Sequence, residues 1–381
     1  MSILFEPIPL KNMTLCNRFV RSATYDGMSD ATGQVTDRQI NLIADLAAGG
    51  VVLIISAIMY VHPSGQVSAF MNSIAGDESI DGLKKLTGAA HERGAKIAVQ
   101  LYHGGREARF LKTKNELPFG PSVIADDPFY RGNYRAITED EIQEVIDAYG
   151  RAARRAREAG FDAVQIHGAH GYLPSQFLSP FTNRREDCWG GSLENRLRLH
   201  REIYRKIRGM VGEDYPVLIK LGVADGFTGG LNPAEGMEAA RLLAETGYDG
   251  LEISSGVRGE KYEGTEYKTK IHKASRQGYF RSWAREIKNK VNVPVIAVGG
   301  LRSTSMMEQM IQNQEADLIA LCRPLISEPA LIRDWEKDSH KKPRCVYCNK
   351  CLEGLYHGTP LRCFAYQPLN GKLRRTNARS A

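Results

Sequence analysis

Short apolar runs alternate with amphipathic segments along most of this chain. Eight runs rich in β-branched and other apolar residues predict strands at residues 19–23, 51–56, 96–101, 163–167, 217–221, 250–254, 293–298 and 316–321. The segments between them carry apolar residues at helical spacing. Ile142, Val145, Ile146 and Tyr149 recur every three or four residues and predict a stripe buried against a sheet. Strands that alternate with helices are typical of a parallel sheet with crossover helices.

Several of the expected helices begin with recognisable caps. Thr36 and Thr138 each precede a Gln or Glu three residues later, which has the form of a capping box, and Asn232 stands before a proline that suits a first helical turn. Eight strand and helix units between residues 19 and 340 predict a closed (β/α)8 TIM barrel of the α/β class. An open doubly wound sheet is the alternative, but no Gly-x-Gly-x-x-Gly segment follows the first strand.

Three segments depart from this alternation. Residues 103–137 and 255–272 form long connections after the third and sixth strands, and such connections are commonly lids or binding loops. The segment from residue 341 onward breaks the pattern and contains a group of cysteines. We therefore predict two parts, a barrel over residues 1–340 and a C-terminal extension over residues 341–381.

Composition places the chain among globular proteins and argues against several classes of function. It has 381 residues, 42% hydrophobic and 25% charged, which rules out disorder as its main state. The net charge of +7 is a modest excess, so we predict no nucleic-acid partner. A proline near the start argues against a signal peptide, and no run of about 18 uncharged apolar residues is present. We predict a soluble, cytoplasmic protein without a membrane partner.

The richest group of chemically active side chains follows the fourth predicted strand. His167, His170 and Tyr172 lie within six residues there, where the strand ends of a barrel form its catalytic mouth. Backbone groups could satisfy two loop histidines, but two imidazoles with a phenol favour a functional site. As metal ligands the pair would need a third partner, and none stands nearby in the sequence. Alternatively, both imidazoles bind a developing enolate oxyanion and Tyr172 supplies a proton, which suits addition to an activated double bond.

A second candidate site follows the last two predicted strands. Gly299 and Gly300 let the backbone approach a ligand closely, and Arg323 can bind a phosphate bidentately. Barrels commonly build a phosphate site from these loops, although a tight turn with surface arginines is the alternative. Gln100 and Lys220, at the ends of the third and fifth strands, supply an amide and a cation. These are the groups that the pyrimidine side of a reduced flavin needs.

The sequence around His167 resembles that of a known family. Residues 167–180, HGAHGYLPSQFLSP, and residues 183–196, NRREDCWGGSLENR, closely resemble the signature of the old yellow enzyme family of FMN-dependent ene-reductases. Further blocks at residues 17–20, 100–106 and 316–324 are also similar to that family. The resemblance covers roughly residues 3–340.

The resemblance implies a barrel that binds FMN non-covalently, takes electrons from NAD(P)H and reduces the C=C bond of α,β-unsaturated carbonyl compounds. Hydride would pass to flavin N5 and then to the β-carbon of the substrate in the same site. His167 and His170 would bind the carbonyl oxygen, and Tyr172 would donate the proton. The residues implied at the flavin are Ser22, Ala23, Thr24, Tyr25 and Ala57 along the ring, Gln100 and Lys220 at its pyrimidine edge, and Gly299, Gly300, Cys322 and Arg323 near the phosphate.

Four of the seven cysteines, Cys345, Cys348, Cys351 and Cys363, lie close together in the extension. In a reducing compartment such crowding favours metal or cluster ligation over disulfides. The group resembles the four-iron cluster ligands of bacterial 2,4-dienoyl-CoA reductase and trimethylamine dehydrogenase. This implies a [4Fe-4S] cluster, with zinc or four uncommitted thiols as the alternatives.

Three functions from different classes follow from these features. The first is an FMN-dependent ene-reductase acting on a small enone or enal. The second is a metal-dependent barrel hydrolase or lyase with His167 and His170 as ligands. The third is an electron-transfer flavoprotein subunit, whose cluster exchanges electrons with a partner protein. The family resemblance also implies a homo-oligomer.

Overall fold

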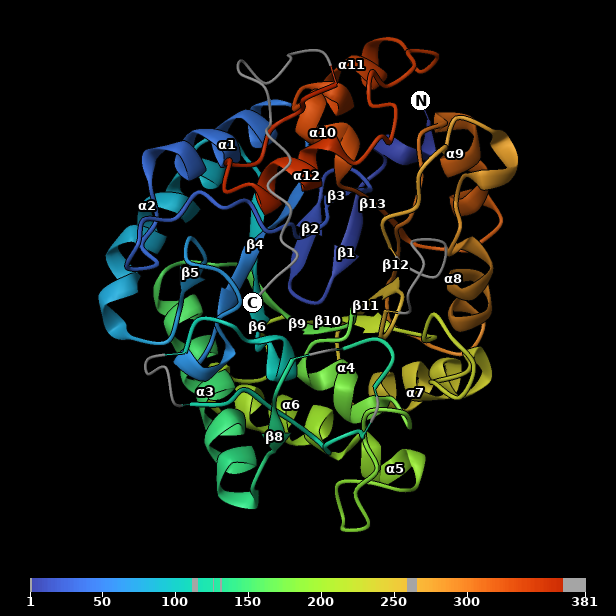
Figure 1. Cartoon of the computed structure of the whole chain (residues 1–381). Coiled ribbons are helices and arrows are strands. Elements are labelled where there is room, and N and C mark those ends of the chain that lie inside the picture. The colour runs from blue at the N-terminus through green and yellow to red at the C-terminus, as the bar shows by residue number, and fades with distance from the viewer. Residues whose placement is uncertain (1, 112–115, 126, 131, 259–265, 366–381) are drawn as a thin grey trace.

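Eight parallel strands close into a barrel, as the sequence predicts (Figure 1). The computed structural model describes residues 2–111, 116–125, 127–130, 132–258 and 266–365. The barrel strands are β3 (Phe19–Arg21), β4 (Leu53–Tyr60), β6 (Lys96–Tyr102), β9 (Ala163–Gly168), β10 (Val217–Gly222), β11 (Gly250–Ser254), β12 (Val295–Ala297) and β13 (Leu318–Leu321). Strand β3 pairs with both β13 and β4, and this pairing closes the ring. All eight predicted strands are confirmed.

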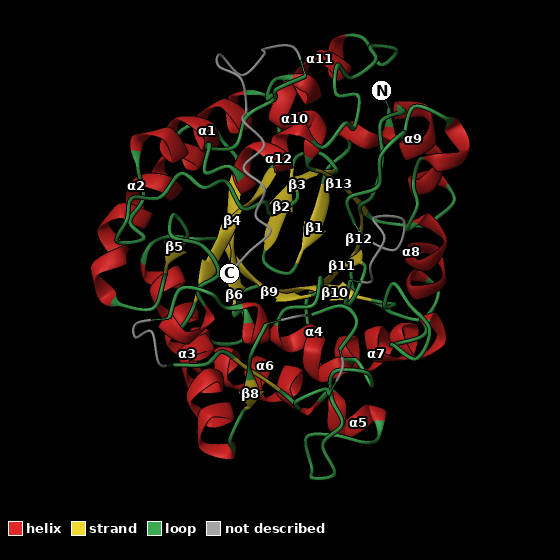
Figure 2. Ribbon diagram, viewed as in Figure 1, coloured by secondary structure: helices red, strands yellow, loops and turns green. Residues whose placement is uncertain are grey.

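Helices form the outer layer around the strands (Figure 2). No helix among the described residues is long and apolar enough to cross a membrane. The capping box at Thr138 is confirmed, because its backbone N–H donates to Glu141 Oε2 at 2.9 Å and Glu141 N–H donates to its hydroxyl at 3.3 Å. The helices include α1 (Asp37–Ala48), α2 (Ile80–His91), α3 (Glu139–Glu158), α6 (Arg198–Val211), α7 (Pro233–Thr246), α8 (Arg281–Lys288), α9 (Thr304–Gln312), α10 (Arg323–Ser327) and α11 (Leu331–Lys337).

An N-terminal hairpin, absent from the sequence-based prediction, fills one end of the barrel. Its strands β1 (Ile8–Leu10) and β2 (Met13–Leu15) are antiparallel and have only three residues each. Alternate side chains of the hairpin are buried against interior residues such as Leu53 and Leu218, which stand near the N-terminal ends of their strands. The hairpin therefore covers the end of the barrel opposite the strand C-termini.

The long connection between β6 and α3 contains short elements of its own. Strands β7 (Phe119–Gly120) and β8 (Arg135–Ala136) pair within it, after a 3-10 turn at Gly105–Glu107. The remaining short elements are β5 (Asn72–Ser73), α4 (Leu173–Leu178), α5 (Leu193–Arg196), α12 (Lys350–Tyr356), and 3-10 turns at Ile3–Phe5, Pro63–Gly65, Asp77–Ser79 and Ala274–Arg276.

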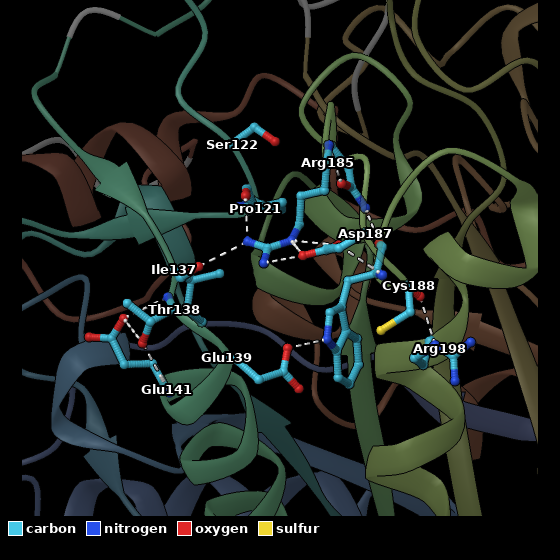
Figure 3. A network of polar contacts seen from close by, with 12 residues as sticks. Pro121, Ser122, Ile137, Thr138, Glu139, Glu141, Arg185, Asp187, Cys188 and Arg198 are labelled. Carbon is cyan, nitrogen blue, oxygen red and sulfur yellow. Dashed lines mark hydrogen bonds and ion pairs between the residues drawn. The ribbon is translucent and has the colours of Figure 1, made fainter.

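The second half of the family signature, residues 183–196, anchors this connection (Figure 3). Arg185 donates to the carbonyl oxygens of Pro121 at 3.2 Å and Ile137 at 2.9 Å. The indole N–H of Trp189 donates to Glu139 at the start of α3, at 2.5 Å. These contacts join segments that flank the barrel mouth, so this part of the signature has a structural role.

The described part of the extension packs against the C-terminal end of the barrel. Tyr347 donates its hydroxyl hydrogen to Leu301 O at 2.9 Å, in the loop after β12. Asn349 donates to Tyr267 O at 2.6 Å, in the loop after β11. Helix α12 follows directly, and Figure 1 places it over the end of the barrel near β3. The extension therefore contributes to the region where the predicted site lies.

Candidate active site

One cavity at the C-terminal ends of the strands collects all but one of the predicted catalytic and flavin-site residues. Its volume is about 430 Å³, within the range of roughly 300–1,000 Å³ typical of cofactor pockets. Ala57 of β4 instead lines an adjacent cavity of about 20 Å³, to which Thr24 also contributes. The predicted residues that line the large cavity are Ser22, Ala23, Thr24, Tyr25, Gln100, His167, His170, Tyr172, Lys220, Gly299, Gly300, Cys322 and Arg323.

The three predicted catalytic rings form one cluster. The ring centroid of His167 lies 4.9 Å from that of His170 and 4.9 Å from that of Tyr172. His167 is the penultimate residue of β9, and the other two rings follow in the turn before α4. His170 and Gly171 have φ angles of 61° and 77°, a left-handed conformation that is uncommon for residues other than glycine. This turn brings three side chains from six residues of chain into one wall of the cavity.

Burial keeps both imidazoles neutral near pH 7. It is the largest cause that lowers the pKa of His167 and of His170 well below the usual value, and the positive charge of Lys220 lowers both further. Ala169 N–H donates to His167 Nδ1 at 3.4 Å, which leaves the ring hydrogen on Nε2. His170 Nε2 lies 2.7 Å from the Ser254 hydroxyl. His167 therefore presents a donor, and Ser254 orients His170.

A partly buried ion pair that the sequence analysis missed borders these rings. Arg258 Nη2 lies 2.7 Å from Glu266 Oε1, and the guanidinium carbon lies 5.4 Å from the centroid of Tyr172. The same carboxylate lies 3.6 Å from His170 Nδ1. Burial is the largest single influence and raises the pKa of Glu266, but the charge and hydrogen bond of Arg258, together with the charge of Lys220, hold that pKa below its usual value. Both residues belong to the long connection after β11, whose length was the available sequence signal.

A neighbouring part of the wall carries a second polar network, because Lys220 stands beside His167 in the strand register. Lys220 on β10 stands directly across from Glu252 on β11 in the strand register, and their charged groups are 2.9 Å apart. Ser22 donates to the same carboxylate at 2.6 Å, and Gln165 donates to it at 2.9 Å. Gln100 in turn donates to Gln165 Oε1 at 2.6 Å. The sequence analysis identified Gln100 and Lys220 but assigned no role to Glu252 or Gln165.

Both glycines of the predicted phosphate site adopt backbone conformations that other residues rarely adopt. Gly299 and Gly300 have φ angles of 111° and 71°, and a Cβ atom at either one would lie 2.8 Å from the ring of Tyr279. Arg323 donates to Asn349 Oδ1 at 2.7 Å, and its guanidinium carbon lies 4.5 Å from the ring centroid of Tyr347. The extension thus holds Arg323, the residue predicted to bind the phosphate, in the cavity wall.

The four cysteines of the extension are free thiols here. Cys345 is buried, Cys348 is exposed, and Cys351 lines the main cavity. Burial raises the pKa of Cys345 to about 11 and that of Cys351 to about 12. Throughout the described ranges, no three His, Cys, Asp or Glu side chains are grouped so as to hold a metal ion. Within the same ranges, His167 and His170 therefore have no third ligand beside them that would support a metal-dependent hydrolase.

Asp225 connects the two loops that follow β10 and β11. Its carboxylate accepts from the backbone N–H groups of Leu231 and Val257, both at 2.7 Å, and from Ser179 Oγ at 2.5 Å. Val257 directly precedes Arg258. Burial raises the pKa of Asp225 to about 6, despite these hydrogen bonds. Asp225 thus ties the loop that carries Arg258 to the loop after β10.

A pH-dependent stability follows from this raised pKa. A carboxyl group whose pKa is higher in the folded than in the unfolded chain binds more protons when folded, so the free energy of unfolding falls as pH rises from about 4 to about 6. The full effect is about 3 kcal/mol, at about 1.4 kcal/mol per pKa unit. Urea unfolding between pH 4.5 and 7 should show a shallower decline for Asp225→Asn than for the wild type. Asp81→Asn, at an exposed site, is the control; equal slopes in all three proteins would contradict the assignment.

Comparisons with known proteins agree with this fold. A match to the NADH:flavin oxidoreductase / NADH oxidase family covers residues 3–342. The NADPH dehydrogenase of Clostridium acetobutylicum is 36% identical over 330 residues, which are 86% of this chain and 93% of that protein. The NADH oxidase of Thermoanaerobacter brockii is 35% identical over 377 residues, which are 97% of this chain and 56% of that protein.

Solved structures give the same result. A complex of 2-naphthoyl-CoA reductase with 2-naphthoyl-CoA superposes with a TM-score of 0.87 at 29% identity, over 95% of this chain and 56% of that one. An old yellow enzyme homologue from Zymomonas mobilis superposes with a TM-score of 0.73 at 26% identity, over 89% of this chain and 94% of that one. The chain thus spans just over half the length of some relatives and nearly the full length of others.

These observations define an oxidoreductase built on a TIM barrel. The chain belongs to the NADH:flavin oxidoreductase / NADH oxidase family. The resemblance to old yellow enzyme, inferred from residues 167–180 and 183–196, is therefore confirmed.

The residues of the cavity fit the flavin that this family name implies. One wall offers a cation and an amide, Lys220 and Gln100, as the electron-rich pyrimidine part of a flavin requires. Another wall offers Arg323 and two glycines in left-handed conformations, which suits a phosphate. The fit rests on residues from four strands or strand ends, at β6, β10, β12 and β13, that meet around one cavity.

Proposed function

We propose that this protein is an FMN-dependent ene-reductase that uses NAD(P)H to reduce the C=C bond of α,β-unsaturated carbonyl compounds. The observation that supports this most directly is the ring cluster. The ring of His167, held neutral by burial, lies 4.9 Å from the neutral imidazole of His170 and 4.9 Å from the phenol of Tyr172, in the same cavity as Gln100 and Lys220. Donors of this kind stabilise the oxyanion that develops when an enone accepts hydride.

The side chains divide the chemistry among themselves. Gln100 and Lys220 would hold the pyrimidine edge of FMN, and Gly299, Gly300 and Arg323 would hold its phosphate. When bound, FMN supplies the hydride that reaches the β-carbon of the substrate. His167 Nε2–H and the His170 imidazole donate to the carbonyl oxygen and so polarise the double bond. Tyr172 then delivers its hydroxyl proton to the α-carbon, which completes the saturated product.

Arg258 favours this proton transfer electrostatically. Its guanidinium lies 5.4 Å from the Tyr172 ring centroid, a distance at which a cation is attracted to the face of an aromatic ring. Loss of the proton leaves Tyr172 negatively charged, which strengthens that attraction. Glu266 holds Arg258 in place through the partly buried ion pair.

Anaerobic mixing in two steps tests the proposal. NADH or NADPH should bleach the yellow holoenzyme, and a following mix with 2-cyclohexenone should restore the colour with formation of cyclohexanone. A protein that nicotinamide never bleaches would instead act as an electron carrier. A protein that is bleached but recovers its colour only with oxygen would show that enones are not its substrates.

We further propose that Cys345, Cys348, Cys351 and Cys363 bind a [4Fe-4S] cluster. The support is their spacing and the good superposition of the extension-containing chain on longer relatives, over 95% of its residues. The thiols are not grouped as ligands in the present structure, so no step of the reaction is assigned to a cluster. We also propose a homo-oligomer and, for the cluster, an electron-transfer partner protein.

Metal content is the measurement for the cysteines. Anaerobically purified wild type should contain about four iron and four sulfide per chain, and Cys348→Ser should lose the iron but keep FMN. Cys188→Ser, at an exposed cysteine outside the extension, is the matched control and should keep both. Zinc without sulfide would replace the cluster by a structural zinc site, and the absence of any metal would leave four free thiols.

A further inference from the structure

Glu252 is a fully buried carboxylate behind the wall of the main cavity. Its side chain has 0% exposure, and it does not border the cavity itself. Moving a carboxylate out of water costs several kcal/mol unless it is paired and hydrogen-bonded. Here three donors meet that need: Lys220 at 2.9 Å, Ser22 at 2.6 Å and Gln165 at 2.9 Å. The barrel thus supplies a complete set of hydrogen-bond donors to a carboxylate that does not line the cavity.

The carboxylate fixes the direction of the hydrogen bonds around it. An ionised Glu252 can only accept, so Gln165 must turn its NH2 group toward Glu252 and its carbonyl oxygen toward Gln100. Gln100 therefore points its NH2 group at Gln165, and its remaining hydrogen-bonding groups are left for the cavity. The orientation of both side-chain amides, Gln165 and Gln100, therefore follows from the negative charge of Glu252.

The Glu252 carboxylate also orients the Lys220 ammonium group and neutralises its charge. Lys220 donates one hydrogen to Glu252 and one to Ser22 Oγ, both at 2.9 Å. An ammonium group has three hydrogens, so one remains for a ligand in the cavity. Because Glu252 and Lys220 carry opposite charges 2.9 Å apart, the wall as a whole is close to neutral.

We propose that Glu252 is a positioning residue that sets the charge and the donor pattern at the pyrimidine edge of the flavin site. It rests on the proposed function only in requiring that FMN occupies this cavity. With Glu252 in place, Lys220 binds the ring without strongly favouring its negatively charged forms, so that the reduced flavin remains a strong hydride donor. Without that charge, the lysine would favour extra negative charge on the ring and weaken its reducing power.

Sulfite binding to the FMN holoenzyme tests this without any enone. Sulfite adds to oxidised flavin and leaves negative charge on the pyrimidine part, so its Kd reports how well the wall tolerates that charge. We expect Glu252→Gln to lower the sulfite Kd at least tenfold and to make the flavin reduction potential more positive. Glu315→Gln, which removes a buried carboxylate paired with Arg281 away from the cavity, should leave both unchanged.

A double variant distinguishes the effect of the lost Glu252 charge from a change in the shape of the site. If the effect of Glu252→Gln comes from the uncompensated Lys220, then Glu252→Gln combined with Lys220→Gln should return the sulfite Kd toward the wild-type value. Should Glu252→Gln fail to fold, Glu252→Asp keeps the charge and should stay within about threefold of the wild-type Kd. A wild-type Kd in Glu252→Gln, or a more than tenfold change in Glu252→Asp, would overturn the role of Glu252.

The outcomes also separate this inference from the proposed function. A holoenzyme that reduces enones while Glu252→Gln binds sulfite like the wild type would overturn only the role of Glu252. A holoenzyme that shows the sulfite effect but reduces no enone would overturn only the ene-reductase proposal. A chain that binds no FMN would overturn both.

Discussion

Replacing both His167 and His170 by asparagine is expected to weaken the binding of phenols and carbonyl ligands by about 100-fold or more while FMN stays bound. In the proposed site each imidazole would supply a hydrogen bond to an oxygen that carries negative charge, and such bonds contribute about 1.5–3 kcal/mol each. The two rings lie 4.9 Å apart and both line the cavity, so one ligand oxygen can reach both. Titration of the oxidised holoenzyme with a para-substituted phenol, followed by its charge-transfer absorbance, measures the loss.

A third buried histidine provides the control for this change. His200 lies in α6, and burial lowers its pKa to about 3, as it lowers those of the two site histidines. His200→Asn should leave phenol affinity unchanged even if it reduces stability. If the double variant at His167 and His170 bound the phenol as tightly as the wild type, these imidazoles would not be the oxyanion ligands. Loss of FMN together with phenol binding would instead indicate a structural role.

Replacing Tyr172 by phenylalanine is expected to slow oxidation of the reduced enzyme by an enone by about 100- to 10,000-fold, the range typical of a lost general acid. Reduction by NAD(P)H should proceed at the wild-type rate, because that half-reaction needs no proton from Tyr172. The phenol ring keeps its packing in this variant, since only the hydroxyl oxygen is removed. Stopped-flow absorbance of the two half-reactions, measured separately under anaerobic conditions, distinguishes the two steps.

Two neighbouring tyrosines make this experiment specific. Tyr267 also lines the cavity, and Arg258 lies 5.2 Å from its ring centroid, so Tyr267→Phe is a matched control that should change neither half-reaction more than a few-fold. The ring centroid of Tyr102 lies 4.5 Å from that of Tyr172. If Tyr102→Phe slowed the oxidation by enone while Tyr172→Phe did not, the proton donor would be Tyr102. Equal slowing of both half-reactions in Tyr172→Phe would point to a disturbed flavin site.

The barrel and the ring cluster could be predicted because their signals are local. Each barrel strand is a short apolar run, and the helix between two strands begins with a cap such as Thr138 whose partner stands three residues away. His167, His170 and Tyr172 lie within six residues of the chain, so the end of a single strand was enough to bring them together. The N-terminal hairpin was missed because three-residue strands give too short an alternation to recognise.

The residues that only the tertiary structure revealed depend on contacts between distant parts of the chain. Glu252 stands in an otherwise apolar strand, and its meaning appears only when the β10 and β11 register places it across from Lys220. Arg258 and Glu266 pair across a loop whose path no local pattern specifies. The extension was predicted as an appended segment, yet Asn349 and Tyr347 hold Arg323 in the cavity wall.

The sequence by itself thus determined the order of strands and helices, the closed barrel and the family, since periodicity, caps and contiguous motifs act over a few residues. The tertiary structure decided which charges neutralise each other, which way the buried amides point and what covers the barrel mouth. Those properties depend on closing the ring between β3 and β13 and on strand register. A shift in strand register would separate Lys220 from Glu252 while leaving every local pattern intact.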